Sequence, residues 1–342
     1  MKGRLIAIDP GPPAMAALVV DGRLEDLLVD GPDATAPRIA EHHRVGGRRL
    51  VPRPGAAAGT LAGGGAGWLR EAADAAEGDR PLAAVTGVAE EGTATPRSGR
   101  RLHRGRFAIL TPLSGGVNVA RGVKDKDERA RLTGIGEAAL RGAAAGLILR
   151  TAARGAEEAE IAEEVAALLR REAALKAGGP PGLVLPAPGV ADYACREWEA
   201  NEIIEEPGVF DRLGLWSAID LLRAPRAPLG RGAWMAVEPT AALVAVDVNT
   251  GADTAADAAA RANLSAAADL PRQLRLRGLG GQVTVDFAPM RKADRKAVEA
   301  ALSRALAADP VQTTIAGWTP LGHLEMIRKR ERRPTAPLLP DA

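Results

Sequence analysis

The chain of 342 residues carries 45 Lys and Arg against 43 Asp and Glu, and this near-balance identifies no class of partner. Apolar residues (46%) and charged residues (26%) are present in proportions typical of a globular protein of two or three compact units, while aromatic residues reach only 3%. A single cysteine, Cys195, excludes an internal disulfide and a cysteine-based zinc site within one chain and favours the cytoplasm; no secretory signal or membrane span is expected either.

Two short apolar strands are predicted first, at residues 3–8 and 16–20, around a Pro-rich turn. Residues 44–112 differ, because their apolar pieces are short and are broken repeatedly by Gly and Pro. That pattern predicts a small β-rich unit or barrel. His42, His43 and His103 lack the spacing of metal ligands, so we expect them at the surface.

Helical patterns dominate residues 127–176, interrupted by one apolar strand at 146–149. The segment 157–176 predicts an amphipathic helix with acids early and bases late, which suits the helix dipole. A Gly- and Pro-rich break at 178–182 precedes another short strand at 183–185.

The most regular pattern begins near Trp234. It predicts a strand at 242–247, a helix at about 254–277 with a kink at Pro271, a strand at 282–287 and a helix at about 292–307. The Pro-rich segment after Arg333 is expected to be disordered.

Two aspartates lie where the two strands of this strand–helix–strand unit end. Such a crossover makes the strands parallel neighbours, so Asp247 and Asp286 should emerge at one edge of the sheet. Two carboxylates so close repel each other unless a cation lies between them, and Mg²⁺ prefers oxygen ligands of this kind. Asn249 follows on the same side of the strand and could orient a carboxylate or an attacking water. The alternative is that each Asp only caps a following turn or helix.

Basic residues near this pair favour an anionic polymer as substrate. Arg272, Arg275 and Arg277 follow one another near the end of the predicted helix, and the run 328–333 contains Lys329 and Arg330. The alternative for any single arginine is a solvated helix end.

Several motifs carry a resemblance to a known family, in its order and approximate spacing. They are Val237–Thr240, Val246–Gly251, Asn263–Leu264, Arg272–Arg277, Leu279–Gly281, Val285–Phe287 and Leu321–Arg330. Together they resemble the catalytic core of the ribonuclease E/G family. The resemblance implies a Mg²⁺-dependent endonuclease for single-stranded RNA that leaves 5′-phosphate products, with Asp247 and Asp286 as metal ligands and Asn249 at the matching family position.

A second match lies upstream. Gly146–Ala152 resembles the family's sensor for the RNA 5′-monophosphate, which would place Arg150 and Thr151 around the phosphate. Arg121 matches the first of two basic family residues, whereas Gly122 stands at the second. Arg121, the three helix arginines, Lys329 and Arg330 are therefore predicted to contact RNA.

The family also implies an α/β architecture of several subdomains. These are a ribonuclease-H-like part (1–33 and 183–235), a degenerate OB-fold barrel (34–112), a sensor (113–182), a deoxyribonuclease-like catalytic part (236–333) and a disordered tail (334–342). The stacking aromatics of an RNA-binding barrel are nearly absent, so Trp68 is more typical of core packing than of base stacking.

Other departures leave alternatives open. Ala241 and Pro289 replace two acidic family residues, and the family's Cys-Pro-x-Cys zinc link does not occur in the sequence. We therefore expect a short form without the zinc-linked tetramer, with a homodimer possible. A non-catalytic RNA-binding protein of the same fold is the main alternative to an endoribonuclease in RNA processing or decay; a metal-dependent phosphodiesterase for DNA or a small nucleotide is the other.

Overall fold

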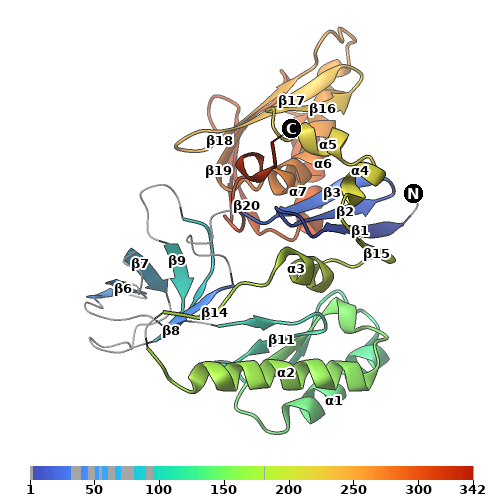
Figure 1. Cartoon of the computed structure of the whole chain (residues 1–342). Coiled ribbons are helices and arrows are strands. Elements are labelled where there is room, and N and C mark those ends of the chain that lie inside the picture. Colours follow the sequence, from blue (N-terminus) through green and yellow to red (C-terminus); the bar gives the residue numbers. More distant parts are fainter. Residues whose placement is uncertain are drawn as a thin grey trace. The chain divides into compact units, whose positions relative to one another are not determined.

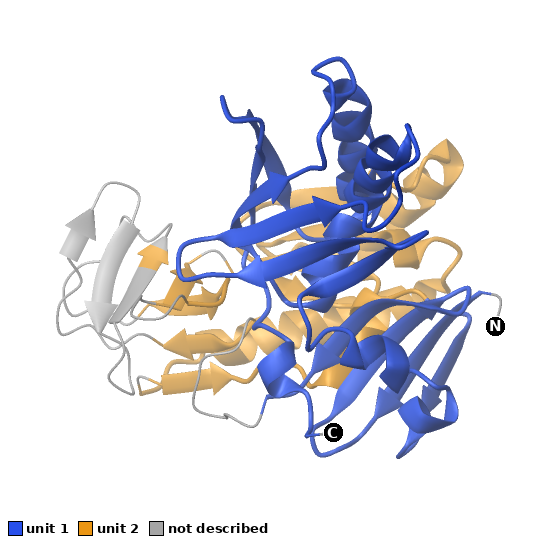
Figure 2. Cartoon of the chain, turned by 90° about the horizontal axis from the view of Figure 1, so that it is seen from above, with its two compact units in different colours: residues 1–34, 200–342 blue, residues 35–199 orange. Residues whose placement is uncertain are grey.

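The chain divides into two compact units, each built from sheets and helices. The computed structural model describes residues 3–31, 40–44, 51–53, 56–60, 66–70, 81–89, 95–99, 101–180 and 182–341. These residues form four β-sheets and seven α-helices (Figure 1), which confirms the expected mixed α/β class. Unit 1 holds residues 1–34 and 200–342, and unit 2 holds residues 35–199 (Figure 2). The finer division into subdomains stays a prediction.

The first sheet of unit 1 joins the start of the chain to a segment two hundred residues later. Its strands lie in the order β15, β1, β2, β3, with β15 parallel to β1 and the other pairs antiparallel. The strands are β1 (Arg4–Asp9), β2 (Met15–Val20), β3 (Arg23–Val29) and β15 (Glu202–Glu205). Apolar residues of these strands pack against the short helices α4 (Val209–Arg212) and α5 (Trp216–Asp220), burying Phe210 and Ile219 completely.

The second sheet of unit 1 has six strands in the order β16, β17, β18, β19, β21, β20. They are β16 (Arg226–Gly230), β17 (Ala233–Pro239), β18 (Val244–Asn249), β19 (Gly281–Asp286), β20 (Thr313–Trp318) and β21 (Leu324–Arg328). The helices α6 (Ala258–Leu276) and α7 (Arg295–Ala308) share one apolar cluster with the inward side chains of the strands. One face of the sheet is therefore packed against helices, and the side chains of the other face, here called the outer face, point away from them.

The first sheet of unit 2 carries the segment that resembles a phosphate sensor. Its order is β10 (His103–Arg104), β11 (Ala108–Thr111), β13 (Gly146–Leu149) and β12 (Gly116–Val119). The helices α1 (Lys126–Leu140) and α2 (Glu158–Lys176) pack against it, and Leu132, Leu147 and Val165 from three of these elements are fully buried. A short 3₁₀ turn, η1 (Thr151–Ala153), follows β13, and helix α3 (Val190–Glu197) lies near the end of the unit.

Seven strands form the second sheet of unit 2, in the order β14, β4, β8, β9, β7, β6, β5. They are β4 (His42–Arg44), β5 (Val51–Arg53), β6 (Ala56–Thr60), β7 (Ala66–Arg70), β8 (Leu82–Val85), β9 (Thr95–Ser98) and β14 (Gly182–Leu185). Over the described residues this sheet is open, with β14 and β5 at its edges, so the expected closed barrel is not seen. The side chain of Trp68 lies outside the described residues.

Residues 103–111, which the predicted barrel included, pair with the sheet that carries the sensor-like segment. The carboxylate of Glu164 on α2 accepts hydrogen bonds from the backbone N–H groups of Arg106, Phe107 and Ala108, at 2.7, 2.8 and 2.9 Å. A Cβ atom on Gly105 would lie 2.3 Å from a Glu164 oxygen, so a larger residue there would displace this carboxylate. These contacts hold the β10–β11 turn on α2.

Two of the histidines expected at the surface are buried. His42 on β4 and His103 on β10 are 3% and 2% exposed, and their rings stack with centroids 5.1 Å apart. Glu172 of α2 holds Nε2 of His103 at 2.7 Å and accepts from Arg101 at 3.0 Å. Their positions are opposite to the prediction because the strands carrying them pack against each other, which residue spacing does not reveal.

The segment after Arg333 is ordered where disorder was expected. It contains the 3₁₀ turn η2 (Ala336–Leu338), and Leu339, 6% exposed, joins the apolar cluster of the first sheet of unit 1. Arg223 donates a hydrogen bond to the carbonyl of Pro340. One buried leucine and one backbone contact thus fasten a segment whose Pro content alone is typical of a loop.

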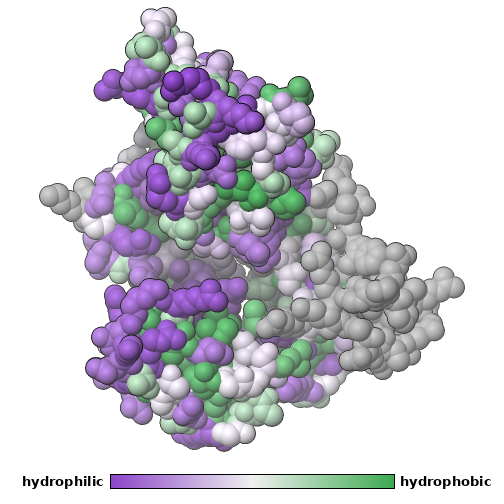
Figure 3. Space-filling model, turned by 180° about the vertical axis from the view of Figure 1, so that it is seen from behind, coloured by the Kyte–Doolittle hydropathy of each residue, from purple (hydrophilic) through white to green (hydrophobic). Residues whose placement is uncertain are grey.

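The described surface mixes hydrophilic and hydrophobic residues on the side shown in Figure 3. Across the described part of the chain, no helix combines the length and the apolar character needed to cross a membrane.

Candidate functional site

The two aspartates singled out in the sequence are direct neighbours in the second sheet of unit 1. Strands β18 and β19 run parallel, and Asp247 pairs with Asp286 in their register. Val246, Val248 and Val285 point into the apolar core, so the alternation of side chains directs both aspartates to the outer face. Both are exposed, the Asp286 side chain by 64%. The expected arrangement of parallel neighbouring strands with paired aspartates is confirmed.

Polar side chains adjoin this pair on the outer face. The amide nitrogen of Asn249 donates to Oδ2 of Asp247 at 2.6 Å, two residues along the same strand. On the other side, Nε2 of His323 lies 3.8 Å from Oδ1 of Asp286. The backbone N–H of His323 donates to the hydroxyl of Thr319 at 3.1 Å, which anchors the turn before β21.

The donor set fits a hard divalent cation. Adjacent strands lie about 4.8 Å apart, so two in-register carboxylates can share one ion. Mg²⁺ is bound by one or two carboxylates together with water and substrate phosphate, and it needs no closed cage of protein ligands. Among the residues that the structure describes, no group of three or more His, Cys, Asp and Glu could hold a metal ion. Asp247 and Asp286 therefore fit Mg²⁺ as a pair of ligands, and they would not form an all-protein site.

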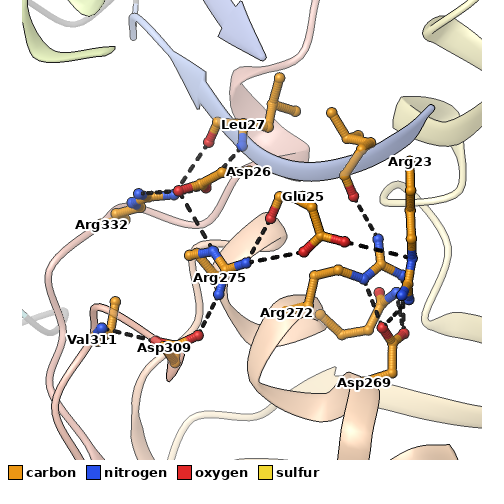
Figure 4. Close-up of polar contacts among 12 residues, drawn as sticks. Arg23, Glu25, Asp26, Leu27, Asp269, Arg272, Arg275, Asp309, Val311 and Arg332 are labelled. Atoms are coloured by element: carbon orange, nitrogen blue, oxygen red, sulfur yellow. Dashed lines mark hydrogen bonds and ion pairs between the residues drawn. The ribbon is translucent and has the colours of Figure 1, made fainter. Parts of the chain in front are cut away.

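Two arginines predicted to contact RNA are engaged inside unit 1 (Figure 4). Arg272 forms two hydrogen bonds to Asp269, at 2.6 and 3.0 Å. Arg275 pairs with Asp309 and lies 3.5 Å from Asp26. Their side chains are only 17% and 11% exposed. Both arginines thus join α6 to other parts of unit 1, and their contact with RNA stays a prediction.

The third helix arginine is buried as well. Arg277 is 6% exposed and donates to backbone carbonyls, at 2.6 Å to Ala224, 3.2 Å to Leu222 and 3.3 Å to Leu221. Arg277 therefore holds the backbone that follows α5, and its contact with RNA stays a prediction. The sequence could not show this, because the accepting carbonyls lie more than fifty residues earlier.

The two basic residues after β21 are more exposed than the buried Arg277. Lys329 is exposed and pairs with Glu331 at 2.7 Å. Arg330 is half-buried, and its guanidinium lies across Gly281, where an added Cβ would come within 2.2 Å of it. Both retain partial exposure, and their contact with RNA stays a prediction.

The residues that resemble a phosphate sensor meet at the ends of two parallel strands in unit 2. Val119 of β12 pairs with Leu149 of β13, so the segment around Arg121 lies beside Thr151. A Cβ atom on Gly122 would lie 2.8 Å from the Thr151 hydroxyl, which shows how close the two segments are. Arg121 is exposed and Thr151 is half-buried.

Arg150 already has partners within unit 2. Its guanidinium donates to the carbonyl of Gly105 at 2.7 Å and to the carbonyl of Arg196 at 3.2 Å. A carboxylate oxygen of Glu197 accepts from it at 2.6 Å. A phosphate at Arg150 would therefore compete with a carboxylate of the chain itself.

Two residues on the outer face were missed in the sequence. Arg226 of β16 lies over the ring of Trp234 of β17, with its guanidinium carbon 4.2 Å from the ring centroid. Trp234 pairs with Asn249 across β17 and β18. The sequence signal that could have marked this pair is a Trp in a chain with few aromatics, at a position that alternates with the apolar residues Met235 and Val237.

Known proteins resemble this chain over the region that contains the residues described above. The sequence pattern of the Ribonuclease E/G family matches residues 103–205 and 191–331. The chain is 30% identical over 285 residues to Ribonuclease E of Nostoc sp. (strain PCC 7120), which covers 70% of this chain and 41% of the relative. It is 30% identical over 268 residues to Ribonuclease G of Escherichia coli K12, covering 66% of this chain and 55% of the relative.

The matched region spans about half the length of these relatives or less. It includes the strand pair that carries Asp247 and Asp286 and the segment of Arg150 and Thr151. With the family pattern matched over more than half of the chain, this chain belongs to the ribonuclease E/G family.

Proposed function

We propose that this chain is an endoribonuclease that hydrolyses phosphodiester bonds of single-stranded RNA with Mg²⁺ as cofactor. The observation that carries the proposal is the direct pairing of Asp247 with Asp286 on the outer face of a sheet. The relatives' names, Ribonuclease E and Ribonuclease G, support RNA as substrate. We place the activity in the processing or decay of RNA, ribosomal RNA included, in the cytoplasm.

Three side chains of the outer face have distinct roles in this proposal. Asp247 and Asp286 would hold Mg²⁺, which when bound neutralises charge on the phosphate and activates water. Asn249 fixes the orientation of the Asp247 carboxylate through its hydrogen bond of 2.6 Å. Attack of water on the phosphorus, with departure of the 3′-oxygen, leaves a 5′-phosphate on the downstream fragment.

A second part of the proposal concerns the RNA end. Arg150, Thr151 and Arg121 would bind a 5′-monophosphate, because a guanidinium and a hydroxyl are strong donors to phosphate. Their meeting at the ends of β12 and β13 supports this role.

Replacement of one metal ligand tests the catalytic proposal. Asp247→Asn keeps the shape of the side chain but removes its charge, so we expect cleavage of 5′-monophosphorylated single-stranded RNA to fall about 100-fold or more. Binding of the same RNA, measured by fluorescence anisotropy in a chelator, should persist. Chelation of the metal should likewise stop cleavage by the unmodified protein.

A matched change is Asp211→Asn, an exposed aspartate on α4 away from the pair. It should leave cleavage unchanged. Cleavage by Asp247→Asn at the rate of Asp211→Asn would exclude the assigned site, and cleavage of matching DNA at an equal rate would exclude RNA specificity. RNA binding without cleavage by the unmodified protein would favour the non-catalytic alternative.

A further inference from the structure

Four strands of the second sheet place their residues in one row across the outer face. Arg226 of β16 pairs with Ala236 of β17, Ala236 pairs with Asp247, and Asp247 pairs with Asp286. In-register neighbours point to the same side of a sheet. Arg226 therefore lies in the row of the aspartate pair, with only the methyl group of Ala236 between them.

The guanidinium of Arg226 is held by an aromatic ring. Its carbon lies 4.2 Å from the centroid of Trp234, a distance at which the positive charge is attracted by the ring face. Trp234 is half-buried and belongs to none of the apolar clusters of unit 1. The indole thus supports the arginine, and it does not serve the core.

The remaining donors of Arg226 face solvent. The residue is exposed, and no hydrogen bond or ion pair of its side chain is formed with any residue in the described ranges. In contrast, Arg272, Arg275 and Arg277 have carboxylates or carbonyls as partners. Because the ring occupies only one face of the guanidinium and no carboxylate pairs with it, the N–H donors of Arg226 are available to an anion.

The distance across the row argues for a substrate anion. Two strand spacings separate Arg226 from Asp247, about 10 Å between Cα atoms, so their side chains form no direct ion pair. An RNA strand that places one phosphate at the aspartate pair must bring a flanking part of its backbone over neighbouring strands. A cation in the same row offsets the charge of that backbone.

We propose that Arg226, positioned by Trp234, binds a backbone phosphate that flanks the bond to be cut. This inference rests on the proposed function for the site, and it adds a substrate-binding residue on the β16 side of the sheet. Trp234 is a positioning residue that acts through Arg226.

The test compares Arg226→Ala with Arg304→Ala, which removes the same charge from an exposed position on α7, the helix that packs on the opposite face of the sheet. RNA affinity is measured by anisotropy in chelator over a range of salt concentrations. Loss of one phosphate contact lowers the slope of log affinity against log salt by about 0.7 for a single strand. We expect that change, with an affinity loss of about 5-fold or more, for Arg226→Ala only.

Variants of Trp234 test its role. Trp234→Ala should weaken binding in the unmodified protein but have little further effect in the Arg226→Ala background, because the ring acts through the arginine. Trp234→Phe should restore most of the affinity, since a phenyl ring still attracts the guanidinium. Circular dichroism of each variant verifies folding, and Arg226→Lys, which keeps the charge, should keep the salt slope.

Equal salt slopes for Arg226→Ala and Arg304→Ala would overturn the inference. It would also be overturned if the losses of RNA-binding free energy caused by Arg226→Ala and Trp234→Ala added up fully in the double variant. Cleavage in Mg²⁺ by the same preparations separates this result from the proposed function. Cleavage that depends on Asp247 but not on Arg226 would reject only the role of the arginine. A slope change without any cleavage would reject the nuclease and leave Arg226 as a residue that binds an RNA phosphate.

Discussion

At the scale of single residues, the role of each arginine depends on its partners more than on its position in the sequence. Arg272 and Arg277 belong to a conspicuous basic motif, yet their donors bind Asp269 and backbone carbonyls. Arg226 stands outside any basic run, yet it is exposed in the same row of the sheet as the aspartate pair. Arg150 lies between these two cases in its availability to an anion, because its partner Glu197 is a carboxylate that a phosphate could displace.

Glu197→Gln tests whether this carboxylate competes with RNA at Arg150. Removing the negative charge should raise the preference for 5′-monophosphorylated over 5′-hydroxyl RNA, by about 3- to 10-fold for an ion pair of about 1 kcal/mol. The preference is measured from the ratio of kcat/KM for the two substrates. Glu163→Gln, an exposed glutamate on α2, is the control and should have no effect. An unchanged ratio for Glu197→Gln, or a preference that survives Arg150→Gln, would count against the sensor.

At the scale of elements, buried polar contacts join the two sheets of unit 2. The stacked rings of His42 and His103 connect β4 to β10, and Glu172 of α2 holds His103 from the other side. Burial, together with the positive charge that His103 can carry, lowers the pKa of His42 from 6.5 to about 4. The folded state therefore favours a neutral His42 over a protonated one.

This lowered pKa predicts a loss of stability in mild acid. Between about pH 6.5 and pH 4 the unfolded chain binds a proton at His42 that the folded chain does not, so stability is complete above that window and falls as the pH drops through it. The expected contribution is about 3 kcal/mol. Hydrogen exchange of β4 and β10 amides, followed in urea between about pH 7 and pH 4.5, measures this change in the free energy of unfolding.

His42→Phe keeps a ring in the stack and removes the proton site, so it should flatten this pH dependence. His323→Gln changes a partly exposed histidine in unit 1 and should not. If the stability of His42→Phe depends on pH as steeply as that of the unmodified protein, His42 is not the source of the stability loss in acid.

At the scale of the whole molecule, unit 1 is built from two segments that are far apart in sequence. Charged side chains connect them: Asp26, 2% exposed, accepts hydrogen bonds from the two terminal guanidinium nitrogens of Arg332 and lies beside Arg275 (Figure 4). Arg275 also pairs with Asp309, which Arg328 contacts at 3.1 Å. Buried charges of this kind are costly unless they are paired, and here the pairs join β3 to α6 and to Arg332.

Asp26→Asn should therefore destabilise unit 1 by about 3 kcal/mol, because it leaves the charges of Arg275 and Arg332 only partly balanced. Urea unfolding followed by hydrogen exchange of β1–β3 peptides measures the change. Asp220→Asn, which breaks an exposed pair with Arg223, should cost about 1 kcal/mol or less. A cost for Asp26→Asn as small as that for Asp220→Asn would show that the network does not hold the two segments together.

Much of the fold around the aspartate pair could be predicted from local patterns. Short apolar segments marked β18 and β19, and the helix between them required a parallel crossover that brings Asp247 and Asp286 to one edge. The open sheet of seven strands, the buried histidines and the ordered residues after Arg333 could not be predicted, because each depends on contacts between segments far apart in the chain.

The amino-acid sequence by itself determined that Asp247 and Asp286 lie side by side and which strands carry them, since strand periodicity and the crossover rule act locally. Only the tertiary structure decided which cations remain available to a substrate. A guanidinium looks the same in the sequence whether it faces solvent over Trp234 or pairs with a buried carboxylate, and that difference arises only when distant strands and helices pack together.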